Sequence, residues 1–442
     1  GEPQAKRRKL LSPGCRVQVK GLSTETGKKL NGQYAYVIDE DASGRWTVDL
    51  DGGARKALKA ENLVLARRLR PGVRVEVHGL KSGIGMALNG KHGVVVQERD
   101  PTTMRYQVEV EDSGVRALRE GNLTFEESGL HLVAHSISMK GPRPSQEDRH
   151  VQVTDLHKVA AALHYSLEHL PRPCAMFAVF DGHLGYSCAD YIAKNTHAKI
   201  IPRLAREAEA EPQGIKALLR EAFSELDEEF LAQQDCPDGS TGIVALIIGT
   251  DLFVANVGDS CGLLCGPKGK DVEFVFPDHK PGSAAERKRI AEIGGEVVEL
   301  GGCVRVAHAN FEERTIEYER QQSVAPGESL DPMPIALAVS RSFGDRDFKL
   351  SADGETRVNL VNCDADVDHV MLDPGHHRAL VLMSDGISDV MSLDEVGKKV
   401  VSLDGQPKAA STALCSDSLA RGSQDNVTAN VIFFRWAKTG KT

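Results

Sequence analysis

The sequence has no uninterrupted apolar run of the about 18–20 residues that a membrane-spanning helix requires, so we expect no such helix. Its nine cysteines are odd in number and include no CxxC pair, which argues against a disulfide framework or a zinc ribbon and favours a reducing compartment. Residues 1–9 carry charges with no apolar segment behind them, so no secretory signal is predicted. The remaining composition is ordinary for a soluble globular protein, and 442 residues suggest two to four domains.

Charge is distributed unevenly along the chain. Residues 1–128 contain 22 Lys and Arg against 17 Asp and Glu, whereas the remainder contains 32 against 46. The acidic remainder is a poor match for nucleic acid but is suited to attracting divalent cations. The basic run Lys6–Lys9 is compatible with a nuclear-import signal and equally with a flexible tail. We therefore expect a cytoplasmic or nuclear protein.

Two consecutive segments, 11–65 and 69–125, repeat one pattern. The matching stretches are 12–19 with 70–77, 30–32 with 88–90, 45–48 with 105–108, and 61–63 with 121–123. Apolar residues alternate within them, which is the periodicity of a half-buried strand, and Asn-Gly and Asp-Gly-Gly steps supply tight turns. The pattern predicts a basic tail at 1–10 followed by two all-β repeats at 11–68 and 69–128.

Each repeat resembles, at the level of the fold, a small Src-homology-3-like barrel. The resemblance implies a binding module for proline-rich peptides, other protein segments or nucleic acid, and the fold does not choose among them. Because the rest of the chain is acidic and therefore a poor partner for nucleic acid, we expect an unidentified protein or peptide ligand. Trp46 and Tyr106 occupy matching positions, for which a core or cross-strand role is favoured over a ligand-binding platform.

Residues 131–437 have a different character, with long apolar strands and amphipathic helices. Apolar residues at three- and four-residue steps predict helices over 213–234 and 283–293. Segments rich in Val, Ile, Phe and Ala predict buried strands over 174–180, 242–248, 252–257, 379–383 and 427–434. This region is therefore of the α+β class.

Acidic residues recur beside these strands. Asp181, Asp259 and Asp385 follow predicted strands, Asp425 precedes one, and Glu147 lies in an acidic pair upstream of them. A single Asp-Gly step is more often a turn than a ligand, but five acidic motifs in order indicate that their carboxylates converge at one site. Converging carboxylates repel one another unless a cation neutralises them, and oxygen ligands select Mg²⁺ or Mn²⁺. The sequence thus predicts a site for Mg²⁺ or Mn²⁺.

The motif order resembles that of the metal-dependent protein phosphatases of the protein phosphatase 2C type. The resemblance covers residues 131–437 and rests on a set of short motifs, which are 141–148, 177–183, 238–241, 257–260, 278–281, 286–295, 337–345, 384–389 and 422–426. It implies a sandwich of two antiparallel sheets flanked by helices. It also implies metal-dependent hydrolysis of phosphoserine and phosphothreonine in phosphorylated protein substrates.

The same resemblance implies roles for individual residues. Asp181 would bridge two metals with help from the Gly182 carbonyl, flanked by Glu147 on one side and by Asp385 and Asp425 on the other. Asp259 and Asp385 would hold a third, weaker metal. Arg143 would bind the substrate phosphate, and His183 would donate a proton to the departing oxygen. An arginine fork matches phosphate oxygens, and a histidine can protonate an alkoxide near neutral pH.

The sequence departs from the family pattern at positions near these motifs. Leu184 replaces a usual Gly, Cys261 a usual Arg, Ser388 a usual aromatic residue and Gln146 a usual Met. None of these changes removes a predicted metal ligand. Residues 310–334 fall where the family carries a variable flap, and their polar composition predicts a surface insertion.

Other functions stay open at this point. A tyrosine-phosphatase mechanism is disfavoured because the sequence has no Cys-x5-Arg loop. A catalytically silent binding protein with a phosphatase fold is an alternative, against which the complete set of carboxylates argues. A further alternative makes the repeats a nucleic-acid or chromatin module, to which the small positive charge of residues 1–128 gives limited support.

Overall fold

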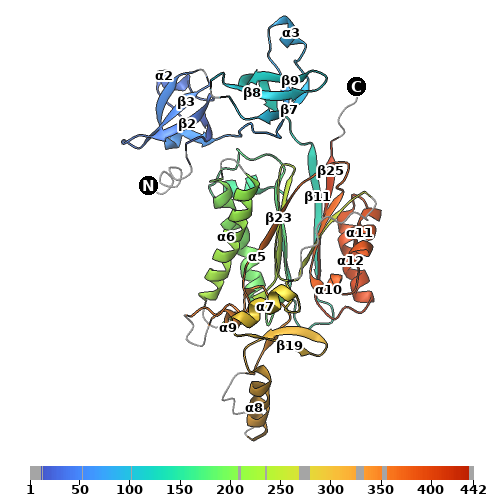
Figure 1. The fold of residues 1–442 in the computed structure, drawn as a ribbon. Helices are drawn as coiled ribbons and strands as arrows, with labels where there is room; N and C mark the ends of the chain where they lie inside the picture. Colours follow the sequence, from blue (N-terminus) through green and yellow to red (C-terminus); the bar gives the residue numbers. More distant parts are fainter. Residues whose placement is uncertain are drawn as a thin grey trace.

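The computed structural model describes residues 11, 13–51, 53–100, 102–207, 211–233, 236–267, 279–324, 333–350 and 356–437. Two small β-sheets lie at one end of the molecule, and a larger layered body of sheets and helices lies beside them (Figure 1). Among the described residues, no helix is long and apolar enough to cross a membrane.

The first repeat forms a five-stranded antiparallel sheet of order β4-β3-β2-β1-β5 with a short helix α2. Its elements are β1 (Arg16–Val19), α2 (Glu25–Lys28), β2 (Tyr34–Glu40), β3 (Arg45–Leu50), β4 (Arg55–Lys59) and β5 (Leu63–Leu65). The second repeat has the equivalent order β10-β6-β7-β8-β9. Its elements are β6 (Arg74–Val77), α3 (Gly83–Met86), β7 (His92–Gln97), β8 (Arg105–Val110), β9 (Gly114–Arg119) and β10 (Leu123–Phe125). The predicted strand content of both repeats is confirmed.

The expected closure of each repeat into a barrel is not found. In the described part of both repeats, the outer strands β4 and β5, and likewise β9 and β10, are not paired with each other. β5 and β10 are only three residues long, so each offers few backbone groups for a second ladder. The repeats are thus open sheets, each with its own apolar core.

A buried polar cluster joins the two repeats. Tyr106, in the core as predicted, lies with its hydroxyl 2.7 Å from the Tyr36 hydroxyl of the other repeat. Arg16 donates from Nε to Glu120 Oε1 at 2.7 Å and also binds Asp51. Burial raises the pKa of Glu120 and raises that of Tyr36 to about 12. Separating the repeats would therefore break the Arg16–Glu120 ion pair and the Tyr36–Tyr106 hydrogen bond.

The larger body is a sandwich of two antiparallel sheets. One has the order β11-β25-β24-β18, and its strands are β11 (Leu130–Met139), β25 (Val427–Trp436), β24 (Ala379–Met383) and β18 (Cys261–Cys265). The other has the order β12-β13-β16-β17-β23, and its strands are β12 (Arg149–Val153), β13 (Cys174–Phe180), β16 (Gly242–Ile248), β17 (Asp251–Val257) and β23 (Asp366–Met371). Their facing apolar side chains form one core cluster, which includes Phe177, Ile243 and Ile432. All five predicted strands are present, within one or two residues at their ends.

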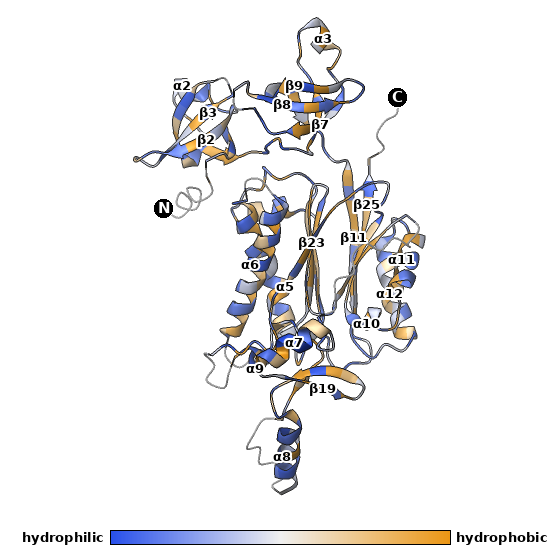
Figure 2. Cartoon of the chain, in the orientation of Figure 1, coloured by the Kyte–Doolittle hydropathy of each residue, from blue (hydrophilic) through white to orange (hydrophobic). Residues whose placement is uncertain are grey.

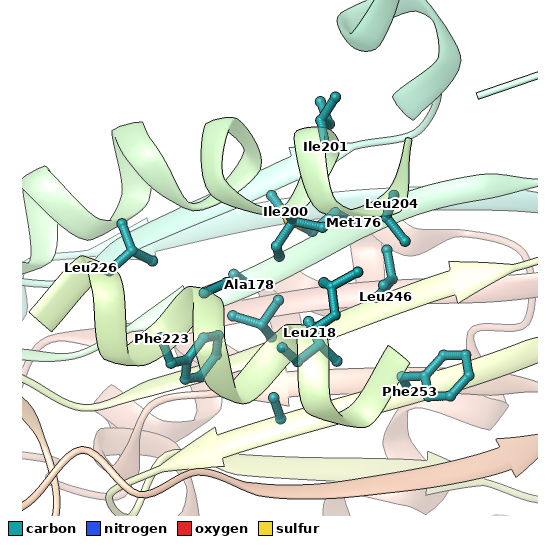
Figure 3. Packing of buried hydrophobic residues seen from close by; sticks show 14 of the residues in the cluster. Met176, Ala178, Ile200, Ile201, Leu204, Leu218, Phe223, Leu226, Leu246 and Phe253 are labelled. Carbon is teal, nitrogen blue, oxygen red and sulfur yellow. The ribbon is translucent and has the colours of Figure 1, made fainter. Parts of the chain in front are cut away.

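Helices cover the outer faces of both sheets. α5 (Ser187–Leu204) and α6 (Pro212–Leu231) pack on the five-stranded sheet, where their apolar faces meet its strands (Figures 2 and 3). The short α4 (Leu156–Ala162) joins the same layer. On the four-stranded sheet lie α10 (Asp385–Ser388), α11 (Leu393–Ser402) and α12 (Pro407–Ala420). The helix predicted over 213–234 is α6, and that predicted over 283–293 is α7 (Ala284–Glu292), capped by Ser283.

Two small sheets and a protruding helix complete the body. One small sheet contains β14 (Gly182–His183), β15 (Gly239–Ser240) and β22 (Phe343–Gly344), and α9 (Arg346–Lys349) follows it. The other contains β19 (Glu296–Leu300), β20 (Cys303–Ala307) and β21 (Ala336–Leu337). The predicted insertion at 310–334 contains α8 (Phe311–Val324), which protrudes opposite the repeats (Figure 1). Residues 325–332 lie outside the described part.

Candidate active site

The predicted metal ligands come from both sheets of the sandwich. Asp181 follows the fully buried β13, Asp259 follows β17, Asp385 follows β24, Asp425 precedes β25, and Glu147 precedes β12. Burial raises the pKa of Asp181 well above its usual range, and the charges of Asp148, Asp385, Asp259 and Asp425 raise it further. Carboxylates far apart in sequence therefore lie close enough to repel one another.

Asp148 belongs to this cluster, although no role is predicted for it from the sequence. It is 2% exposed, and its Oδ2 accepts hydrogen bonds from Ser384 Oγ at 3.0 Å and Thr428 Oγ1 at 2.6 Å. No donor in the described part of the chain reaches its buried Oδ1. Burial raises the pKa of Asp148 to about 6. The only sequence signal for it was its place in the acidic pair Glu147-Asp148.

The carboxylate cluster is better suited to binding a hard cation than to accepting hydrogen bonds from the protein. Burial, and then the charge of Asp259, raises the pKa of Asp385 to about 7. Asp181 contacts the carboxyls of both Asp148 and Asp385, an arrangement that is favourable only when a proton or a cation lies between them. A buried carboxylate oxygen without a donor is what a divalent ion with oxygen ligands would satisfy. Among the described residues, however, no three His, Cys, Asp or Glu side chains already form a metal-binding group.

Two cations lie against the rim of this cluster. Arg143, the predicted phosphate-binding residue, donates from Nη2 to Asp425 Oδ2 at 2.6 Å and from Nε to the Gln424 carbonyl at 3.0 Å. Lys280 Nζ lies 3.5 Å from Asp259 Oδ2. Arg143 is thus at the site, but it neutralises a predicted metal ligand instead of standing apart from it. Asp278, from the same motif as Lys280, lies outside the described residues.

His183, the predicted proton donor, is held by a carboxylate that sequence reasoning missed. Its Nε2 lies 2.8 Å from Asp345 Oδ2, and Asp345 is 1% exposed. Burial alone lowers the pKa of His183, but the charge and hydrogen bond of Asp345 act together with the charges of Asp259 and Glu147, so the net shift is upward. Asp345 has a φ of 53°, in the left-handed region that few non-glycine residues adopt. The sequence signal for a role of Asp345 was its position after Gly344 at the end of the motif 337–345.

Glycines let the backbone approach these groups closely. A Cβ at Gly182 would lie 2.7 Å from the Glu147 carbonyl oxygen, and one at Gly386 would lie 2.1 Å from the Asn426 carbonyl oxygen. A side chain at either place would push the carboxylate-bearing segments apart. Leu184, by contrast, adopts a φ of 58° and is 49% exposed, so its side chain is not buried among the carboxylates.

Comparison with known proteins gives the family to which the chain is similar. The sequence model of the family Protein phosphatase 2C matches residues 135–427. Probable protein phosphatase 2C 55 of Oryza sativa subsp. japonica is 29% identical over 397 residues, which cover 88% of this chain and 85% of the relative. Probable protein phosphatase 2C 59 of Arabidopsis thaliana is 30% identical over 264 residues, which cover 59% of this chain and 70% of the relative.

A solved structure shares the fold. The serine-threonine phosphatase 2C from Toxoplasma gondii superimposes with a TM-score of 0.54 at 24% identity, covering 68% of this chain and 94% of the other. The family match spans more than half of the chain and contains every residue of the carboxylate cluster. The chain therefore belongs to the protein phosphatase 2C family and is a protein serine/threonine phosphatase.

Proposed function

We propose that this chain hydrolyses phosphoserine and phosphothreonine in proteins in a reaction that depends on Mg²⁺ or Mn²⁺. The carboxylate cluster around Asp181 supports this proposal, because its mutual repulsion calls for divalent cations. Asp181, Gly182 through its carbonyl, Glu147, Asp385 and Asp425 would hold two ions, and Asp259 with Asp385 a third. When bound, such ions lower the pKa of water and neutralise phosphate charge.

The chain's own residues would bind and protonate the substrate. Arg143 carries a planar fork of donors that suits phosphate oxygens, and its partial exposure leaves it accessible to them. Because Asp345 occupies Nε2 of His183, Nδ1 is the ring nitrogen that can face a leaving group. From there His183 would protonate the departing Ser or Thr oxygen, whose alkoxide is too basic to leave readily on its own.

The test is hydrolysis of a phosphothreonine peptide with and without Mn²⁺ or Mg²⁺. We expect release of inorganic phosphate only with the metal, full loss in a chelator, and binding of Mn²⁺ by calorimetry in the absence of substrate. Folded protein that binds Mn²⁺ but releases no phosphate at any metal concentration would instead support the silent binding protein. Failure to bind either ion would contradict the proposed metal site itself.

We further propose that different segments of the chain have different functions. Residues 11–68 and 69–128 would recruit substrates or locate the enzyme through a protein or peptide ligand, residues 1–10 would be a basic tail, and residues 131–437 would carry catalysis in the cytoplasm or nucleus. The buried cluster around Arg16 supports treating both repeats as one binding unit. Nucleic-acid binding by residues 1–128 with steep salt dependence would favour the chromatin alternative.

Exchange of residues 310–334 for a short linker is expected to change the order in which phosphoproteins are hydrolysed. α8 protrudes from the body and is mostly exposed, so its loss removes a contact surface without opening the core. Turnover of p-nitrophenyl phosphate should stay within about threefold of the wild type, because a small aryl phosphate does not reach α8. An unchanged ranking of phosphoprotein substrates would contradict a role for this insertion in specificity.

A further inference from the structure

A buried ion pair lies behind the His183 site and is not part of the carboxylate cluster. Lys349 of α9 donates from Nζ to Asp227 Oδ1 of α6 at 2.6 Å, and the side chains are 1% and 5% exposed. Burial alone lowers the pKa of Lys349, but the charge and hydrogen bond of Asp227, together with the charges of Cys363 and Asp345, raise the pKa above its usual value. An enclosed pair of this kind is weak evidence for stability, because apolar residues of the same volume often serve as well. The contacts of this ion pair indicate a role other than stabilising the fold.

The pair holds the segment that carries Asp345. Asp227 Oδ1 also accepts from the backbone N–H of Gly344 at 2.8 Å, and Lys349 Nζ also donates to the carbonyl of Ser342 at 2.7 Å. The two charges therefore fix the backbone polar groups on both sides of Phe343. Ser342 Oγ in turn donates to Asp345 Oδ2. The ion pair is thus connected to His183 Nε2 by hydrogen bonds through the backbone and hydroxyl of Ser342 and the carboxylate of Asp345.

The same segment is fixed by packing and by backbone geometry. Phe343 is fully buried, and its ring packs against those of Phe180 and Phe223. Gly344 has a φ of 72°, and a Cβ there would lie 2.4 Å from the Asp238 carbonyl oxygen. Packing and backbone geometry therefore restrict the position of this segment. Asp345 follows it directly in a left-handed conformation, so the position of the segment sets the orientation of the Asp345 carboxylate.

We propose that Asp227 and Lys349 are positioning residues for catalysis, which act through Ser342 and Asp345 to hold the His183 ring in the orientation for proton donation. The inference rests on the proposed donor role of His183. Loss of the pair would let the 342–345 segment shift and turn the Nδ1 face of His183 away from the leaving oxygen. The metal ligands and Arg143 lie on other elements and would be unaffected.

The choice of leaving group separates positioning from general destabilisation. p-Nitrophenolate is a weak base that departs without a proton, whereas the alkoxide of threonine requires one. The double variant Asp227→Asn/Lys349→Met removes both charges, keeps an oxygen for the Gly344 N–H and avoids a lone buried charge. We expect its kcat on a phosphothreonine peptide to fall roughly 10- to 100-fold, while kcat on p-nitrophenyl phosphate stays within about threefold.

The matched control is Lys199→Met, which removes a half-buried lysine paired with Glu229 between α5 and α6, away from the 342–345 segment. It should leave the ratio of the two activities unchanged. Ser342→Ala removes only the hydroxyl that binds Asp345, and it tests the same route should the double variant fail to fold. We expect Ser342→Ala to lower the peptide activity selectively, by about threefold to tenfold.

Equal losses on both substrates, or no loss on either, in the double variant and in Ser342→Ala would overturn the positioning role. His183→Gln identifies which step has failed. If His183→Gln lowers peptide turnover selectively and the other variants do not, the donor role stands and the inference is wrong. If His183→Gln lowers both activities equally, the donor role is wrong and the inference falls with it.

Discussion

Replacing Asp181 with Asn is expected to lower turnover of a phosphothreonine peptide by about a thousandfold or more in saturating Mn²⁺. Asp181 lies at the centre of the carboxylate cluster, where four other Asp charges act on it. Under the proposed mechanism it bridges both ions, so the neutral amide would lose the ligand that the two share. Asp385→Asn should behave alike, because Asp385 contacts Asp181 and belongs to the same cluster.

The same variant should have the opposite effect on stability when metal is absent. Burial and the neighbouring charges disfavour the ionised form of Asp181 in the folded protein, and an amide of the same shape relieves this cost. Without metal, Asp181→Asn is therefore expected to melt above the wild type, and with Mn²⁺ the order should reverse. Differential scanning calorimetry with Mn²⁺ and with chelator measures both melting temperatures.

Asp394→Asn is the control for these experiments. Asp394 is exposed on α11 and lies near Lys398, so its substitution should change neither turnover nor the effect of Mn²⁺ on the melting temperature. Turnover by Asp181→Asn close to that of the wild type would contradict the central position assigned to this carboxylate. A lower melting temperature in chelator would contradict the repulsion that motivates the metal site.

Much of the layered fold could be predicted because its signals are local. The strands at 174–180 and 242–248 are continuous apolar segments of strand length, and the structure has both at the predicted bounds. Helix α6 followed from its apolar spacing alone. The prediction of closed barrels in the repeats was wrong, because closure depends on whether strands distant in sequence pair with each other. Helix α8 was missed because its sequence lacks the apolar face from which helices are recognised.

The site divides in the same way. The carboxylates at 181, 259, 385 and 425 could be predicted because each stands beside a strand or a turn glycine. Asp148 and Asp345 could not, because their importance comes from neighbours far along the chain. Asp148 is defined by the hydroxyls of Ser384 and Thr428, and Asp345 by the His183 ring. Residues of this kind carry no distinguishing pattern until the fold brings their partners together.

Gly239→Ala is expected to disable proton donation and to destabilise the fold. A Cβ at Gly239 would lie 2.2 Å from Asp345 Oδ2 and 2.3 Å from His183 Nε2, far inside contact distance. Neither group can retreat easily, because β15 is paired with β14 on one side and β22 on the other. We expect a loss of about 1–3 kcal/mol in the free energy of unfolding from overpacking. Turnover of the phosphothreonine peptide should fall about a hundredfold or more, since a positioned general acid contributes at least that much.

The matched control for Gly239→Ala is Gly282→Ala, where a Cβ would meet only Val304 side-chain atoms at 3.6–3.7 Å, an ordinary contact. Its stability should change by no more than about 0.5 kcal/mol and its activity not at all. In Gly239→Ala, hydrolysis of p-nitrophenyl phosphate should survive better than hydrolysis of the peptide, because the carboxylate cluster is built on other segments. Wild-type turnover of both substrates by Gly239→Ala would mean that His183 donates its proton without support from Asp345. Equal losses on both substrates would instead place the damage in the fold as a whole, because the His183–Asp345 contact alone affects only the leaving group that needs a proton.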